Sequence, residues 1–119
     1  MVAENDALRR EAAAMLARTD KELYAELVPQ AELERTAFSF DGRVARGREL
    51  FGSIWQDVRG LVCSYYRKHE KTVGNKVDVA ALIATALLHN PALAGISVVA
   101  FAALIAKIGV AELCAHNHA

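Results

Sequence analysis

Three residues with metal-binding chemistry lie close together near the end of the sequence. Cys114, His116 and His118 alternate with other residues there, and thiolate and imidazole groups are preferred ligands of Zn²⁺. On a helix, however, Cys114 and His118 share a face while His116 points away, and the sequence specifies no fourth ligand. We therefore interpret them as a polar tail after the last helix, and we predict neither a bound metal nor a cofactor.

The candidate motifs for catalysis are incomplete. His69 and Glu70 begin the zinc-protease pattern HExxH, but Val73 occupies the position of the second histidine. The segment 73–76 (VGNK) lacks the first glycine and the Ser/Thr of a phosphate-binding loop. His89 lies at the end of an apolar run, which favours a helix-end residue over an acid–base catalyst. We predict that the protein is not an enzyme; a small enzyme or metal-binding protein that uses His89 or the histidine tail is an alternative.

A basic segment with two tyrosines could bind nucleic acid. Residues 43–78 contain eight basic and four acidic residues, whereas residues 1–42 contain nine acidic and five basic ones. Its cations could follow phosphates while Tyr65 and Tyr66 stack on bases. Both tyrosines, however, fall on the apolar stripe of a predicted helix, and the whole chain has a formal net charge of zero. We predict that nucleic acid is not a partner and that these charges are solvated or paired with the acidic segment.

The elements that position these residues are organised around one apolar stretch. Residues 79–106 include no Asp, Glu, Lys or Arg. A helix that is apolar on every side has no face for water, so the stretch lies either inside a protein or in a bilayer. Asn90 and Pro91 divide it into two helices, at about 79–89 and 91–115, because Asn caps helices and Pro fits their first position.

A membrane location is the first alternative for this hairpin. A spanning helix needs about 20 largely apolar residues, whereas the uncharged run provides 12 residues before Pro91 and 16 from Pro91 onward. Gly95 and Gly109 lie inside the second predicted helix, where the close approach of a neighbouring helix would account for them. We favour a buried hairpin, and we keep a membrane-active protein that inserts it as the alternative.

Amphipathic helices are predicted at about 4–28 and 43–69. Thr19 and Glu22 fit a capping box, so the first helix is either one helix or two with a break there. A loop at 38–42 separates the two regions, with a β-hairpin around Asp-Gly as the alternative. In the second helix, apolar residues recur at intervals of three and four and predict a buried face. The candidate core and interaction residues are Phe51, Ile54, Trp55, Val58, Leu61, Val62, Tyr65, Phe101, Ala102 and Ala106.

Together these features predict an all-α protein, a compact four- to six-helix bundle with the nearly uncharged C-terminal hairpin as its core. Cys63 and Cys114 are predicted to be unpaired small hydrophobes in a reducing, cytoplasmic setting. Hydrophobic residues make up 54% of the sequence. A single copy of a chain this size buries only about two-thirds of its unfolded surface, so it is not expected to bury all of this apolar material. We therefore predict a non-catalytic protein–protein interaction or adaptor module that associates with itself, as a dimer or larger, and with another protein.

Overall fold

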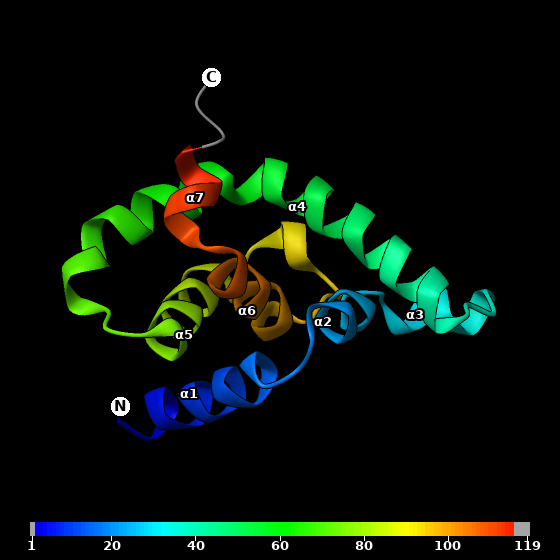
Figure 1. The fold of residues 1–119 in the computed structure, drawn as a ribbon, viewed down its shortest axis with the longest axis horizontal. Helices are drawn as coiled ribbons and strands as arrows, with labels where there is room; N and C mark the ends of the chain where they lie inside the picture. The colour runs from blue at the N-terminus through cyan, green and yellow to red at the C-terminus, as the bar shows by residue number, and fades with distance from the viewer. Residues whose placement is uncertain (1, 116–119) are drawn as a thin grey trace.

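One short apolar helix, α6 (Val98–Ile108), lies near the centre of the molecule, with α1, α2, α5 and α7 packed against it (Figure 1). The computed structural model describes residues 2–115, with side chains from residue 6 onward. These residues contain no strand, which confirms the all-α class and excludes the hairpin at 38–44. The other elements are α1 (Val2–Leu16), α2 (Asp20–Glu26), α3 (Gln30–Arg35), α4 (Phe40–His69), α5 (Lys76–Leu87), α7 (Val110–Ala115) and the 3₁₀ turns Glu70–Thr72 and Pro91–Leu93.

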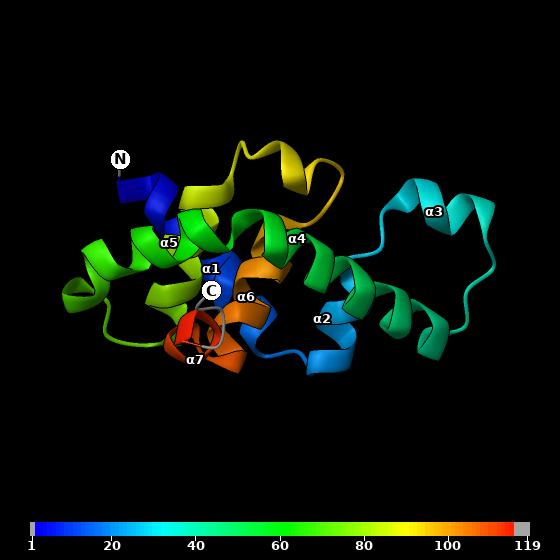
Figure 2. The same ribbon diagram turned by 90° about the horizontal axis from the view of Figure 1, so that it is seen from above.

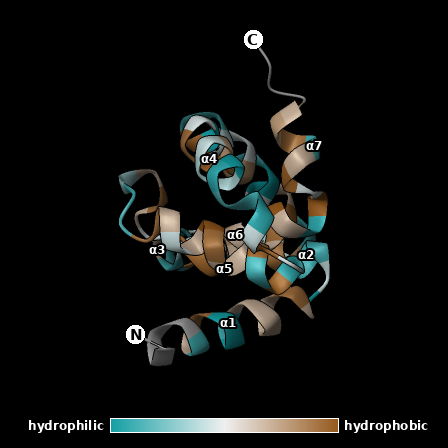
Figure 3. Ribbon diagram, turned by 90° about the vertical axis from the view of Figure 1, so that its left-hand side faces the viewer, coloured by the Kyte–Doolittle hydropathy of each residue, from teal (hydrophilic) through white to brown (hydrophobic). Residues whose placement is uncertain are grey.

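The burial of α6 explains the run without charges. Every side chain from 99 to 106 is at most 8% exposed, because α5 packs along α6 while α1, α2 and α7 contact its other sides. In Figure 3 the hydrophobic colour is concentrated on α5 and α6, whereas α4 carries both colours, as an amphipathic helix does. The apolar hairpin is thus covered by the chain's own helices.

Local capping residues set the ends of the N-terminal helices. Thr19 separates α1 from α2: its hydroxyl accepts the backbone N–H of Glu22, and the Glu22 carboxylate accepts the backbone N–H of Thr19. This is the predicted capping box, and it resolves the region 4–28 into two helices. The helix α4 begins at Phe40, three residues earlier than predicted, because Ser39 caps it by accepting the Gly42 N–H. Part of the predicted loop at 38–42 is therefore helical.

The prediction of one continuous helix at 91–115 is wrong. The segment consists of a 3₁₀ turn, α6 and α7, with breaks at Gly95 and Gly109. These glycines have φ angles of 77° and 114°, a left-handed region that cannot continue a right-handed helix and that glycine enters at little cost. The helix α5 begins at Lys76, three residues earlier than predicted, because Asn75 caps it by accepting the backbone N–H of Asp78.

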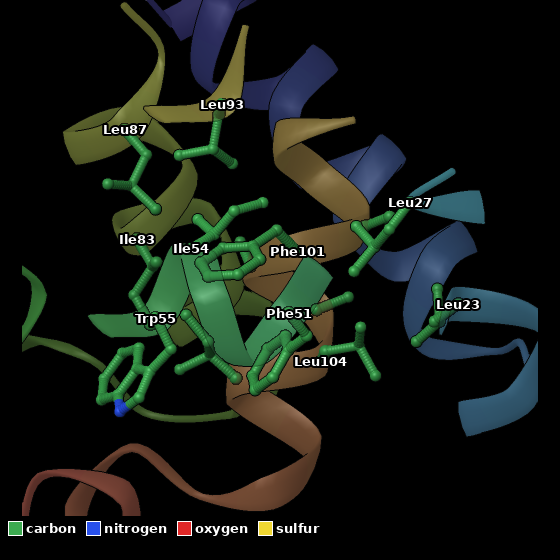
Figure 4. Packing of buried hydrophobic residues seen from close by; sticks show 14 of the residues in the cluster. Leu23, Leu27, Phe51, Ile54, Trp55, Ile83, Leu87, Leu93, Phe101 and Leu104 are labelled. Carbon is green, nitrogen blue, oxygen red and sulfur yellow. The ribbon is translucent and has the colours of Figure 1, made fainter. Parts of the chain in front are cut away.

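The core forms where α4 crosses α5 and α6 (Figure 4). Phe51 lies in the seam between α4 and α6, with its ring centroid 5.0 Å from that of Phe101. Trp55, one turn further along α4, is 4% exposed. At Gly47, the backbones of α4 and α2 touch: a Cβ there would lie 1.8 Å from the Tyr24 carbonyl oxygen. Glycine at this position lets the two helices approach.

Helix length bears on the membrane alternative. The most apolar helix, α6, has 11 residues and is therefore about 16 Å long, roughly half of a bilayer's hydrocarbon core. None of the helices in residues 2–115 is long and apolar enough to cross a membrane.

Candidate interaction groove

A disulfide bond joins the C-terminal half of α4 to α7. Cys63 and Cys114 are 51 residues apart in sequence, and their Cα atoms are 5.8 Å apart. The prediction of two unpaired cysteines is therefore wrong. The chain turns at Gly109 after α6, which brings α7 back beside α4 (Figure 1). The spacing of the two cysteines in the sequence does not indicate that they pair. The one indication is that both lie in predicted helices that are expected to pack together.

A groove lies beside this disulfide, between α4 and α7. Its volume is about 500 Å³. Its lining combines the disulfide and small or aromatic groups with two charged side chains from α4 and the turn after it. The lining residues are Cys63, Tyr66, Arg67, Glu70, Ala111, Cys114 and Ala115. Such a lining can accommodate apolar side chains and interact with charge at the edge.

Positive charge gathers where α4 ends. Arg67 and Lys68 lie in the last turn of α4 and Lys71 in the 3₁₀ turn after it. All three are exposed, and no ion pair within the described part of the chain engages them. Their position suits the helix dipole, whose negative end lies there. Within the groove itself Glu70 is the acidic residue. The lining thus has one cation, Arg67, and one anion, while Lys68 and Lys71 add positive charge to the same end of the helix.

At the other end of α4, one basic residue, Arg46, is paired with the acidic N-terminal segment, as the sequence allowed. The Arg46 guanidinium donates two hydrogen bonds of 2.9 Å to the carboxylate of Glu32 on α3. It also donates one to Glu49. The hydrogen bonds from Arg46 lower the pKa of Glu32 below its ordinary value. The acidic N-terminal segment thus pairs with the start of α4, and the cations at its far end are left exposed to solvent.

The predicted core and interaction residues lie mainly inside the molecule. Eight of them are less than 9% exposed: Phe51, Ile54, Trp55, Val58 and Val62 on α4, and Phe101, Ala102 and Ala106 on α6. Leu61 is 45% exposed, contrary to prediction. It is rotated by about 60° from Val58 around the helix axis, which places it at the margin of the buried face. Tyr65 is partly exposed and packs against the ring of His69.

The residues of the incomplete motifs have structural contacts. The ring Nδ1 of His69 lies 3.0 Å from the Tyr65 carbonyl oxygen on the preceding turn. The Gly74 N–H donates to the Asp78 carboxylate at the start of α5. His89 is exposed, and His116 and His118 lie outside the described residues. Within the described part, no three His, Cys, Asp or Glu side chains are placed to hold a metal ion.

A second cavity, of about 260 Å³, lies between α1, α5 and the end of α4. Arg9 and Asp78 form an ion pair beside it, and the hydrogen bond from Arg9 lowers the pKa of Asp78. The hydroxyls of Thr72 and Thr85 donate to backbone carbonyl groups of their own segments. These polar groups therefore maintain the local structure, and the groove at α7 is the stronger candidate site.

Comparison with known proteins gives no relative: no protein-family model, curated protein or solved structure matches the chain.

Proposed function

We propose that this protein is a non-catalytic helical interaction module that binds an acidic segment of a partner protein in the groove between α4 and α7. The observation that carries the proposal is a partly apolar groove whose lining includes Arg67, at a helix end that also has the exposed cations Lys68 and Lys71. Apolar side chains of a bound segment would contact Tyr66 and Ala111, and its carboxylates would face Arg67 and its neighbours. Charge complementarity of this kind selects partners and accelerates association.

Self-association through the apolar helices has less support. The helices α5 and α6 are buried against the chain's own elements. Among residues 6–115, the large hydrophobic side chains that are largely exposed are Phe40, Leu61 and Leu88, and they belong to different parts of the fold. The apolar surplus that motivated self-association is thus largely accommodated within one copy. Light scattering at tens of micromolar is the direct test, with 12.9 kDa expected for a monomer.

The oxidation state of the two cysteines bears on the compartment in which the protein works. The expectation of a cytoplasmic setting depended in part on unpaired thiols, and the Cys63–Cys114 bond removes that part of its basis. A disulfide persists in an oxidising compartment and is reduced in most cytosols. The proposed module therefore works with its groove intact in an oxidising environment. Trapping free thiols in cells before lysis would report the state of both cysteines.

The binding test uses a fluorescein-labelled peptide of about 15 residues, composed of Glu, Ala and Leu with leucines on one helical face. Fluorescence anisotropy at moderate salt measures its affinity. We expect Arg67→Glu to weaken binding by about tenfold or more, because the change reverses a charge in the groove lining. Lys21→Glu is the matched control, since Lys21 is an exposed cation on α2, away from the groove.

The possible outcomes separate the classes of partner. Equal weakening by Arg67→Glu and Lys21→Glu would show unspecific attraction and contradict the proposal. A DNA duplex that binds more tightly than the peptide, and loses affinity with Arg67→Glu, would make nucleic acid the partner. A mass that doubles with concentration in the wild type and not in Arg67→Glu would make a second copy of the chain the occupant of the groove.

A further inference from the structure

We infer that the Cys63–Cys114 disulfide is a redox clasp that forms and dismantles the groove; the inference rests on the proposed function for its biological consequence. Both cysteines line the groove and both are partly exposed. The bond therefore lies at the surface that a partner would contact, where a dissolved or protein-bound thiol can reach it, and not in the closed core around α6. It links the two helices that form the groove's walls.

The wall formed by α7 depends strongly on this bond. The helix has six residues, and a helix this short is not stable without tertiary support. Its apolar contacts are Val110, which is buried, and Leu113, which is partly buried. Gly109, with its φ of 114°, joins α7 to α6 through a turn that is not part of either helix. Loss of the disulfide therefore frees α7 to leave α4.

The rest of the fold does not depend on α7 in the same way. The helix α6 is covered by α5, α1 and α2 as well. The buried face of α4 runs from Val44 to Val62, and most of it, including Phe51 and Val58, lies one turn or more before Cys63. Reduction therefore removes one wall of the groove while the central packing remains.

The chemistry of opening is thiol–disulfide exchange with a dithiol reductant. A thiolate of the reductant attacks the sulfur of one cysteine, the S–S bond breaks, and the other cysteine leaves as a thiolate that takes up a proton. The second thiol of the reductant then attacks its own mixed disulfide and releases the first cysteine. The two cysteines gain two electrons and two protons, and the dithiol becomes a disulfide. Closing is the reverse reaction with a disulfide oxidant.

The test compares the oxidised full-length protein with the protein reduced by dithiothreitol, using the acidic peptide described above as the probe. We expect reduction to weaken peptide binding by about tenfold or more. Hydrogen exchange of the α7 amides should become faster, while the α6 amides stay protected. The double variant Cys63→Ser/Cys114→Ser should behave like the reduced wild type whether or not dithiothreitol is present. If that variant does not fold, the reduced wild type and Cys114→Ser give the same comparison.

The readouts distinguish failure of the clasp from failure of the proposed function. Equal peptide binding by oxidised and reduced protein would overturn the clasp and leave the proposed function standing. If the oxidised protein does not bind the peptide, the proposed function is wrong. Hydrogen exchange of the α7 amides then still tests the redox clasp: faster exchange on reduction supports it, and unchanged exchange overturns it. Loss of protection in α6 on reduction would also overturn it, because the bond would then hold the entire fold.

Discussion

The two ends of α4 hold their neighbouring helices by different chemistry. At the N-terminal end, α3 has no buried residue and is attached through the ion pair between Glu32 and Arg46. Figure 2 shows α3 and this end of α4 extending beyond the remaining helices. At the C-terminal end, α7 is attached through the Cys63–Cys114 disulfide. Between these ends, α4 is held by buried apolar side chains.

The difference indicates where along α4 apolar packing alone no longer holds the neighbouring helices. A helix of 30 residues is about 45 Å long and extends past the core in both directions. Of the short helices beside its ends, α3 has no buried residue and α7 has one, Val110, and each is also held by a specific bond. A partly exposed ion pair such as Glu32–Arg46 responds to pH and salt, whereas a disulfide responds to thiols. The following predictions test this division, beginning with the region between the two ends.

Trp55→Ala should have the largest effect. Trp55 is 4% exposed, and truncation of a large buried aromatic side chain costs about 3–5 kcal/mol. Its Nε1 has no hydrogen-bond partner among the described residues, so the loss is one of packing. Leu61→Ala is the control on the same helix, because Leu61 is 45% exposed and should change stability by about 0.5 kcal/mol or less. Urea unfolding followed by circular dichroism measures both; similar effects of the two changes would contradict the assigned burial.

Removing the disulfide should have the next largest effect on global stability. The bond joins residues 51 apart, and a crosslink of this kind stabilises a protein by about 2–4 kcal/mol, in part by restricting the unfolded chain. Cys63→Ser/Cys114→Ser should therefore lower the free energy of unfolding by about this amount. Dithiothreitol should do the same to the wild type and leave the variant unchanged. A double variant as stable as the oxidised wild type would show that the bond adds little to the fold.

The sequence predicted the middle of α4 better than its ends. The spacing of Phe51, Trp55 and Val58 indicates a buried face because helical periodicity directly encodes packing against a core. The disulfide and the groove depend on the turn at Gly109, which sends α7 back to α4. Glycine ends a helix at little cost, whereas inside a helix it costs about 1 kcal/mol relative to alanine. The prediction placed Gly109 inside a helix and attributed it to a close neighbour, and this was the wrong choice.

Exposed charges were harder to assign than buried residues. The sequence indicated that acidic and basic segments could pair, and Glu32 and Arg46 do so. It did not indicate that the cations at the end of α4 stay free of ion pairs in the described structure, because pairing depends on which surfaces the fold brings together. The candidate groove was missed for the same reason: Tyr66 and Ala111 are 45 residues apart and become neighbours through the path of the chain.

Ala102→Leu should have an intermediate effect. Ala102 is fully buried on α6, and forcing a larger side chain into a packed core costs about 1–3 kcal/mol. Thermal unfolding in buffer and partition into liposomes are compared for the wild type and the variant. Lower stability with no liposome binding by either protein is the expected result. Unchanged stability with stronger partition would favour the membrane-active alternative, because a lipid-facing helix gains from added apolar surface.

The smallest effect on global stability is expected at the N-terminal end of α4, from the Glu32–Arg46 pair. Hydrogen bonds from Arg46 lower the pKa of Glu32 in the folded protein. The stabilisation is therefore fully present above the unfolded-state pKa and is lost as the pH falls through the lower folded-state pKa. Because the pair is only partly buried and α3 has no buried residue, the loss should appear as local release of α3 and not as unfolding. Nuclear magnetic resonance should show the α3 amide signals shifting with the titration of Glu32, with those of α6 unchanged.

The variant Glu32→Gln tests whether the charge of Glu32 holds α3 in place. The amide retains the shape of the carboxylate but not its charge, so α3 should be released at neutral pH and its signals should no longer depend on Glu32 titration. Glu34→Gln is the matched control, since Glu34 is exposed on the same helix and forms no ion pair in the described structure. Dithiothreitol should leave the α3 signals unchanged in all three proteins, because the disulfide acts at the other end of α4. A change at α3 on reduction would show that the two ends are coupled through the long helix, contrary to the independent attachments argued above.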